Sequence, residues 1–362
     1  MKKIRNNEKN LNFNRAKKHH KRKLTFKKKK KKKRKRQQGL NKAQRKQQDL
    51  YETKYKDYVK IKSPDILSFV KNPEGTNTLI HLIKKQYLKR KKVFVILKHV
   101  EILGYDALVV LLSILIRFKA KGIPFNGDMP DNFVARKILV NSGFLDYLYR
   151  NIKSEDRYEL LKGGTISTHA WKKVDAELTH QIISDASLSI WGEKRRFQGV
   201  QRSLIELMHN TNNHAVYGKE GDKHWFLSVQ HLPKENKVCF SFIDFGVGIF
   251  DSLNNKGEES KWYGWRSPLS KIFTFNNNKE LLKLILNGDL HKTVTGKYYR
   301  GKGLPGIYDA FKRNDFSKLH IISNDVFADV KNNDFRTLTN KFSGTFVYWE
   351  LNKSNTCKDG ID

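Results

Sequence analysis

The chain has 362 residues with 72 Lys or Arg and 36 Asp or Glu, which gives a net charge of +36. Residues 1–50 hold 23 Lys and Arg against two acidic residues, about +21, so the remainder carries only about +15. Two cysteines, Cys239 and Cys357, are too few for a disulfide framework or a cysteine-based metal site. No apolar run reaches transmembrane length and no apolar segment follows the basic start, so we expect a cytoplasmic protein. The length of the chain favours two domains and a tail.

Residues 1–48 form a low-complexity basic tail, in which Lys27–Arg36 is an unbroken run of ten cations. Such a run repels itself and buries nothing, so we expect disorder or at most a frayed helix. One interpretation is an arm that contacts the phosphates of RNA or DNA and releases counterions. A solvated tail without a ligand and a contact with an anionic membrane surface are the alternatives, and the sequence leaves all three open.

Residues 64–150 alternate strand and helix patterns, which predicts a small α/β domain. The stretch Asp106–Lys119 is apolar almost all round, so this helix should be buried on most faces. Gly122 suits the end of that helix. The other expected elements, in chain order, are short helical pieces at 66–70 and 79–88, a strand at 93–97, a strand from 123, and a helix at 133–140 that ends near Gly143.

This pattern resembles a STAS domain, the module of anti-sigma factor antagonists, and the resemblance implies a site for a protein partner. In that family the loop after the central strand carries a phosphorylatable serine. Here the matching loop, Ile102–Ala107, contains neither Ser nor Thr, so a phosphorylation switch is not expected at this point. An unrelated α/β lid is the alternative interpretation.

Residues 151–194 are expected to be a connector that includes a helix within Ala170–Ser189. Three histidines, His169, His180 and His209, have no ligand-like spacing with other metal-binding side chains, so we interpret them as ordinary polar positions. The chain also lacks the phosphoacceptor motif of sensor histidine kinases, in which the histidine is followed by Glu and then by Leu-Arg-x-Pro.

The segment Phe197–Ala215 has two stripes at helical spacing. Glu206, Asn210 and His214 are each four residues apart and form the polar stripe. The amide oxygen of Asn210 suits a Mg²⁺ ion that also binds nucleotide phosphates, and Glu206, one turn earlier, can activate a water. Considered alone, however, this helix is better explained as an amphipathic helix with an ordinary polar face. The apolar stripe, which should face the core, contains Val200, Leu204, Leu207, Met208 and Thr211.

The segment Val238–Ile249 begins as a buried strand and ends in Asp244-x-Gly246-x-Gly248. A carboxylate at a strand end can accept hydrogen bonds from an adenine amino group, and glycines let the backbone approach a ligand closely. The same residues also serve as ordinary turn chemistry, so this motif alone favours neither interpretation.

The order of four segments resembles the GHKL superfamily of histidine kinase-like ATPases (HATPase_c). Glu206–Ala215 is similar to the N box, Asp244–Gly248 to the first glycine box, Gly301–Ile307 to the second, and Ser343–Thr345 to the last. The resemblance covers residues 195–352 and implies an α/β chain with an α+β two-layer sandwich, the Bergerat-type ATP-binding fold with a mixed sheet. A P-loop motif is absent from the chain.

By this resemblance Asp244 and Thr345 would bind adenine, and Asn210 would bind Mg²⁺ between the phosphates of ATP. Asn213 and His214 would lie nearer the α-phosphate and the ribose. A phosphate loop would open a helix whose first amides face the anion, with Pro305 in its first turn. The remaining implied binding residues are Gly246 and Gly248 at the pocket edge and Gly301, Lys302, Gly303, Leu304 and Gly306 in the phosphate loop.

Residues 250–300 correspond to the ATP lid of that superfamily, although the apolar helical stretch Leu281–Leu286 also suits a surface for a partner. Only the short tail 353–362 follows the ATP-binding segment, which disfavours the topoisomerase, chaperone and mismatch-repair branches because they need a further domain there. We therefore expect a regulatory protein that binds ATP and Mg²⁺, with slow hydrolysis or serine/threonine kinase activity, working by partner switching. The alternative is a module that associates with nucleic acid and takes its conformation from bound ATP. The sequence allows a monomer or a homodimer.

Overall fold

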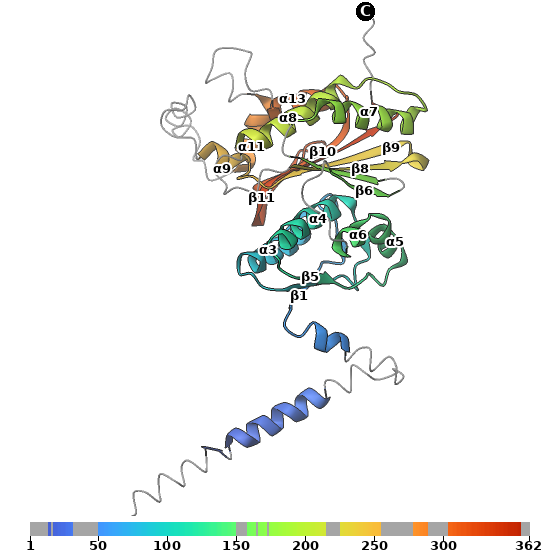
Figure 1. Cartoon of the computed structure of the whole chain (residues 1–362). Coiled ribbons are helices and arrows are strands. Elements are labelled where there is room, and N and C mark those ends of the chain that lie inside the picture. The colour runs from blue at the N-terminus through green and yellow to red at the C-terminus, as the bar shows by residue number, and fades with distance from the viewer. Residues whose placement is uncertain are drawn as a thin grey trace, which may run out of the picture. The chain divides into compact units, whose positions relative to one another are not determined.

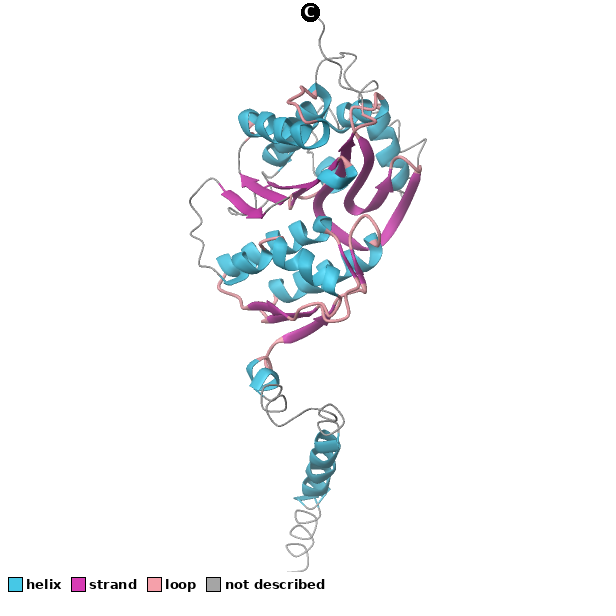
Figure 2. Cartoon of the chain, turned by 90° about the vertical axis from the view of Figure 1, so that its right-hand side faces the viewer, coloured by secondary structure: helices cyan, strands magenta, loops and turns pink. Residues whose placement is uncertain are grey.

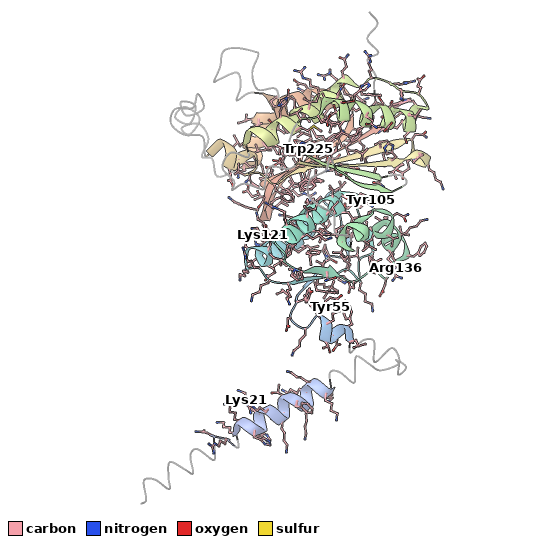
Figure 3. The ribbon with its side chains drawn as sticks, in the orientation of Figure 1. Lys21, Tyr55, Tyr105, Lys121, Arg136 and Trp225 are labelled. Atoms are coloured by element: carbon pink, nitrogen blue, oxygen red, sulfur yellow. The ribbon has the colours of Figure 1, made fainter. Side chains whose placement is uncertain are left out.

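The computed structural model describes residues 14–15, 17–31, 50–149, 158–163, 166–171, 174–214, 225–254, 278–288 and 303–355. The chain divides into two compact units, residues 1–58 and 59–362. In the first unit, residues 17–31 are helical and every side chain of this helix is exposed, including Lys21 (Figure 3). A short helix at 50–54 follows, and the rings of Tyr51 and Tyr55 contact edge to face at 4.9 Å.

The second unit begins with a small parallel α/β arrangement that matches the predicted alternation of strands and helices. Three strands pair in the order β1-β3-β5, and β2 pairs with β4 in a separate parallel ladder. The elements are β1 (Val59–Lys62), β2 (Ile66–Leu67), α3 (Pro73–Leu88), β3 (Val93–Ile96), β4 (Ile102–Leu103), α4 (Tyr105–Ala120), β5 (Phe125–Gly127), α5 (Phe133–Asn141) and α6 (Phe144–Tyr149).

Local chemistry explains the start of α3, where the sequence-based expectation was wrong. Residues 66–70 were expected to be helical, but residues 66–67 form β2. The Asn72 side chain accepts a hydrogen bond from the Gly75 amide and donates one to the Ile66 carbonyl, and Pro73 occupies the first turn. The helix therefore begins only after this cap. The end of α4 was expected correctly, because Gly122 has a φ of +64°.

The segment expected to be a loop, 102–107, forms β4 and the first turn of α4. Asp106 is buried there and accepts hydrogen bonds from the Ser68 hydroxyl at 2.9 Å and the Val70 amide at 3.0 Å. These two bonds tie the start of α4 to the strand-to-helix link that precedes α3. The residues between β3 and β4, 97–101, also contain no Ser or Thr.

A six-stranded sheet, β10-β11-β9-β8-β7-β6, forms the centre of the rest of the unit, and all its strand pairs are antiparallel. The expected mixed sheet is therefore not observed among these strands. For the pairs β6–β7, β8–β9 and β10–β11 the physical reason is a short connection, which favours antiparallel neighbours. The strands are β6 (Tyr158–Gly163), β7 (Ile166–Trp171), β8 (Trp225–Leu232), β9 (Lys237–Asp244), β10 (Ser317–Asp329) and β11 (Asp334–Asn352).

The expected connector, 151–194, contributes regular structure to this sheet. Strands β6 and β7 extend the sheet beyond β8. The helix α7 (Ala176–Trp191) begins at the Asp175 cap, whose carboxylate accepts from the Leu178 amide at 2.9 Å, and ends at Gly192 with a φ of +79°. The connector is thus part of the six-stranded sheet and its helical cover, because β7 finds its hydrogen-bond partner in β8.

Helices cover both faces of the six-stranded sheet (Figures 1 and 2). Phe240 and Phe242 of β9 pack in the core shared with one helical layer, whereas Cys239 and Ile243 face the core shared with the other layer. This alternation follows from the pleat of the strand. The first layer consists of α7, α8 (Gln198–His214), α11 (Asn278–Asn287) and α13 (Gly303–Lys312), and the second of α3 and α4.

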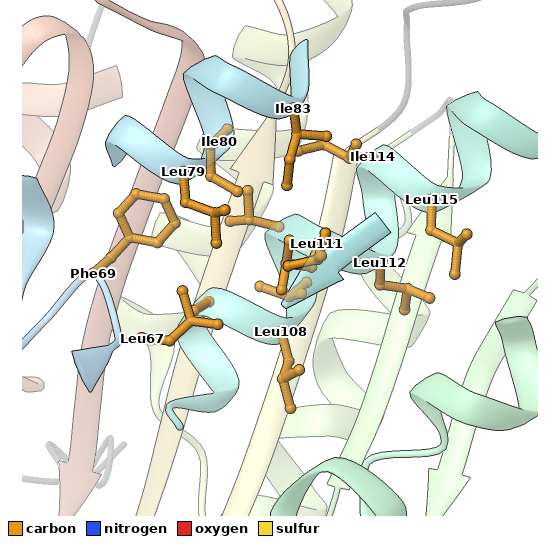
Figure 4. Packing of buried hydrophobic residues seen from close by; sticks show 14 of the residues in the cluster. Leu67, Phe69, Leu79, Ile80, Ile83, Leu108, Leu111, Leu112, Ile114 and Leu115 are labelled. Carbon is orange, nitrogen blue, oxygen red and sulfur yellow. The ribbon is translucent and has the colours of Figure 1, made fainter. Parts of the chain in front are cut away.

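The second layer explains why α4 is apolar almost all round. It contacts β8 and β9 of the six-stranded sheet as well as β5 of the parallel sheet. Figure 4 shows Leu108, Leu111 and Leu112 of α4 beside Ile80 and Ile83 of α3 in this core. Each such aliphatic side chain contributes roughly 1.5–3 kcal/mol when it is fully buried. A helix between two sheets has little surface left for polar residues.

Within the expected lid, α11 belongs to the hydrophobic core. Its side chains Leu281, Leu282, Ile285 and Leu286 are buried against α13 and the sheet. The rest of the expected lid, apart from α9 (Ile249–Asn254) and Gly288, lies outside the described residues. The described helices include none with both the length and the apolar character needed to span a bilayer.

Candidate functional site

A row of paired residues crosses the six-stranded sheet at one end of β9. Asp244, the last residue of β9, pairs with Thr345 of β11 on one side and with Trp225 of β8 on the other. Thr345 pairs in turn with Ser323 of β10. Directly paired residues point to the same face of a sheet. Since Phe242 of β9 packs in the core under α8, this row lies on the α8 face.

The Asp244 carboxyl group is a half-buried acceptor at the start of the turn Asp244–Gly248, called here the glycine turn. Its Oδ1 accepts a hydrogen bond from the Gly246 amide at 2.8 Å. Burial raises the pKa of Asp244 to about 6, although hydrogen bonds from Gly246 and Thr345 oppose the rise. The group is therefore mostly a carboxylate at pH 7, and a ligand with N–H donors can stabilise it by hydrogen bonding.

The glycine turn is held in place by Asn324, which sequence reasoning missed. Its amide nitrogen donates to the Val247 carbonyl at 3.0 Å, and its oxygen accepts from the Phe250 amide at 3.1 Å. Gly248 has a φ of +82°, and a Cβ there would lie 2.4 Å from the Asn324 Oδ1. Gly248 is thus required by both conformation and space. A polar Ser-Asn pair inside the apolar run of β10 was the signal available in the sequence.

Ser323, also missed, connects β10 with β11 and with the start of α9. Its hydroxyl donates to the Gly344 carbonyl at 3.0 Å and accepts from the Ile249 amide at 2.9 Å. The Thr345 hydroxyl lies 3.4 Å away. Gly344 has a φ of +99°, and a Cβ there would lie 1.9 Å from the Asp244 carbonyl oxygen. The close approach of β11 to Asp244 therefore depends on this glycine.

The helix α8 has the two faces that the sequence predicted. Its expected apolar stripe is buried, whereas Glu206 and Asn210 lie partly exposed on another face. The side chain of Asn210 meets the first residue of α13: a Cβ on Gly303 would lie 3.0 Å from Asn210 Nδ2 and 3.4 Å from Oδ1. A larger residue at 303 would displace this amide group.

The start of α13 lies beside α8 and resembles an anion site in its arrangement. Gly303 opens the helix, followed by Leu304 and Gly306 in its first turn. Amide groups at a helix N-terminus that lack intrahelical partners can donate to phosphate oxygens. Gly301 and Lys302, predicted for the same loop, lie outside the described residues. The side chains of Asn213 and His214, in the last turn of α8, also lie outside the described set.

The structure thus brings together residues from four distant segments in two pairs. Asp244 lies beside Thr345, with Gly246 and Gly248 following directly, and Asn210 lies beside Gly303. Both pairs belong to the face covered by α8 and α13, since Phe250 after the glycine turn and Ile307 of α13 share one core with Met208 of α8. Among the described residues, no three His, Cys, Asp or Glu side chains gather as metal ligands.

Comparisons with known proteins yield no relative on which to base a function. No protein-family model matches the chain, and no curated protein matches it.

Proposed function

We propose that residues 195–352 bind ATP with Mg²⁺ in the manner of the GHKL superfamily. The observation that carries this proposal is the placement of two pairs on one face of one sheet, Asp244 beside Thr345 and Asn210 beside Gly303. In this assignment the Asp244 carboxylate accepts the adenine amino group and the Thr345 hydroxyl supports it. The glycine turn lines the edge of the adenine pocket, and the first amides of α13 face the phosphates.

The described side chains fit a magnesium ion that depends on the nucleotide. Asn210 offers one amide oxygen, which is a hard ligand of the kind that Mg²⁺ prefers. Because no group of three acidic or histidine side chains lies among the described residues, phosphate oxygens and water would complete the coordination shell. The ion would screen the phosphate charge when ATP is bound.

Glu206 is the residue we propose as general base. It precedes Asn210 by one helical turn on the partly exposed side of α8. In hydrolysis it would accept a proton from water as the water oxygen bonds to the γ-phosphorus and the bridging oxygen leaves with ADP. In a kinase reaction the attacking oxygen would belong to a serine or threonine hydroxyl of a protein substrate.

The Glu206→Gln variant should bind ATP as the wild type does and turn it over at least about 100-fold more slowly, because general-base catalysis contributes about 10²–10⁴-fold. Phosphate release with Mg²⁺ and transfer of label from radiolabelled ATP to protein measure the two reactions. Phosphate release alone would favour the ATPase, and labelled protein serine or threonine would favour the kinase.

The matched control is Glu280→Gln, because Glu280 is an exposed helical glutamate that pairs only with Lys283 at 3.3 Å among the contacts described. Equal turnover by wild type and Glu206→Gln would refute the role of Glu206. Tight ATP binding with neither reaction would favour a module in which bound ATP sets the conformation.

The exposed basic helix at 17–31 favours nucleic acid as a second ligand, bound separately from ATP. All the described side chains of this helix are exposed. If the unit contacts six or more phosphates, affinity for duplex DNA or RNA should fall roughly 1000-fold or more between about 50 and 200 mM salt. Deleting residues 1–48 should abolish this binding, as a fluorescence anisotropy titration would show.

The control for the deletion is the ATP affinity of the shortened protein, which should stay unchanged. A deletion protein that binds nucleic acid as tightly as the full chain, with the same salt dependence, would contradict a role for the tail.

A further inference from the structure

A cavity lies inside the parallel α/β part of the second unit, and we call it the α4–β5 cavity. The helices α4, α5 and α6 and the strands β3 and β5 contribute to its lining, and Leu67, Leu108 and Leu111 border it (Figure 4). Its volume is about 60 Å³. One water needs roughly 10–15 Å³ of such space, so the cavity holds about four or five non-hydrogen atoms.

The lining of the α4–β5 cavity is apolar with one charged group. Apart from Asn126, Gly127 and Asp128, every described residue that lines it is a Leu, Val, Phe or Met. Asp128 is the only charged residue among them. Pockets of this composition hold the apolar body of a ligand, and their few polar groups set its orientation.

Asp128 lies at the edge of the parallel sheet where ligands of open α/β sheets bind. It directly follows β5, and Leu97 directly follows the adjacent parallel strand β3. The Asp128 Oδ1 accepts hydrogen bonds from the Leu97 amide and, at 3.1 Å, from the Lys98 amide. The other oxygen, Oδ2, has no hydrogen-bond or ion-pair partner among the described residues. One carboxylate oxygen at the cavity is therefore left for a ligand.

The cationic side chains beside Asp128 are paired elsewhere. Lys98 Nζ lies 3.7 Å and Arg136 Nη2 lies 3.8 Å from the carboxylate of Asp131. Burial raises the pKa of Asp128, and the two amide hydrogen bonds and the nearby His99 oppose that rise. A positively charged ligand would therefore stabilise a partly desolvated carboxylate that has no ion-pair partner in the described part of the chain.

We propose that the α4–β5 cavity binds a small aliphatic amine in its ammonium form, with a body of three or four carbon atoms inside the cavity and the ammonium group beside the Asp128 carboxylate. Each CH₂ group that the lining removes from water adds to the affinity. The carboxylate provides a charge-assisted hydrogen bond, which selects the ammonium group over a hydroxyl group on a body of the same shape. All the lining residues lie within 67–148, so this proposal does not rest on ATP binding.

Three small probes test the proposal in ligand-observed NMR titrations of the full chain at 0.15 M salt, where distant charges are screened. Isobutylammonium should bind at a saturable site. Isobutanol has the same shape without the charge, and methylammonium has the charge without the apolar body. Each of these two should bind at least about tenfold more weakly.

Equal affinities for isobutylammonium and isobutanol would refute the role of the carboxylate. Equal affinities for the two ammonium ions would refute the role of the apolar cavity.

The Asp128→Asn variant should bind isobutylammonium at least about tenfold more weakly than the wild type, because the charge is lost. The new amide oxygen can still accept from the Leu97 and Lys98 amides, so the affinity for isobutanol should stay unchanged and show that the cavity is intact. Glu101→Gln is the matched control, since Glu101 is an exposed carboxylate of the same segment outside the lining. Equal isobutylammonium affinities of Asp128→Asn and Glu101→Gln would contradict the assignment.

A second variant tests the space instead of the charge. Leu145 is a half-buried lining residue of α6, and Leu145→Phe should weaken isobutylammonium and isobutanol alike because the larger ring occupies the cavity. Leu82→Phe is its control, since Leu82 on α3 is 39% exposed and outside the lining. Thermal unfolding checks that both variants fold, and unchanged isobutylammonium affinity in folded Leu145→Phe would overturn the cavity as the binding site. If Leu145→Phe does not fold, the comparison of Asp128→Asn with Glu101→Gln decides.

Discussion

The Asp244→Asn variant should bind ATP roughly 30- to 150-fold more weakly than the wild type. A hydrogen bond to a charged group contributes about 2–3 kcal/mol in a buried site, and the substitution removes the charge while adding a donor opposite the adenine amino group. Asp244 is suited to this role because it lies at the end of β9 beside Thr345 and begins the glycine turn. Isothermal titration calorimetry with ATP and Mg²⁺ measures the change.

Asp309→Asn serves as the matched control. Asp309 lies on α13 and its exposed carboxylate pairs with Lys312 at 2.9 Å, so the same chemical change occurs in the same domain away from the row. Its ATP affinity should match the wild type. Undiminished ATP binding by Asp244→Asn would refute the adenine pocket.

The unfolding free energy of Asp244→Asn tests the environment of Asp244. Burial raises the pKa of Asp244 from 3.8 to about 6 in the folded protein. The carboxyl group therefore contributes stability below about pH 4 that is lost as the pH rises through about 6. At pH 7.5 Asp244→Asn should be more stable than the wild type by about 1–2 kcal/mol, and this difference should shrink towards pH 4. Urea unfolding at both pH values would show it, and a difference independent of pH would contradict the raised pKa.

The Gly344→Ala variant should lose about 3–5 kcal/mol of unfolding free energy, as strain at a special backbone position combines with a steric clash. Gly344 has a φ of +99°, and its new Cβ would lie 1.9 Å from the Asp244 carbonyl oxygen. That oxygen belongs to the main chain, so relief requires the pairing of Asp244 with Thr345 to shift. We therefore expect weaker ATP binding in the fraction that folds, measured together with urea unfolding.

Gly122→Ala separates conformation from contact. Gly122 also has a positive φ, +64°, but no heavy atom lies within 4 Å of the position of an added Cβ. Its cost should be only about 1–2 kcal/mol, from the left-handed conformation alone. Equal losses in the two variants would show that crowding against Asp244 contributes nothing.

Patterns with short periods were predictable from the sequence. The stripe of α8 recurs every three to four residues, and the burial of Leu204, Leu207 and Met208 confirms it. The strand before Asp244 and the glycine that ends α4 were also predicted, since β-branched runs and C-terminal glycines act within a few residues. These features depend on local geometry, which the order of residues determines directly.

Pairing between distant segments was not predictable in the same way. Ile66 and Leu67 are as apolar as a helical face, and only their ladder with β4 makes them a strand. Ser323 and Asn324 have no motif of their own, yet β10 brings them against the glycine turn from 74 or more residues away in sequence. A single chain does not reveal which edges will meet, because hydrogen bonds between strands are not specific to residue type.

The sequence alone determined the periodic helices and the order of the four segments that resemble nucleotide-binding motifs. It also determined the uneven charge and the near-complete burial of α4. The tertiary structure decided which surfaces bury α4, the antiparallel order of the larger sheet, and the meeting of Asn210 with Gly303. The physical reason is that local preferences select the elements, whereas burial of their apolar faces selects the neighbours.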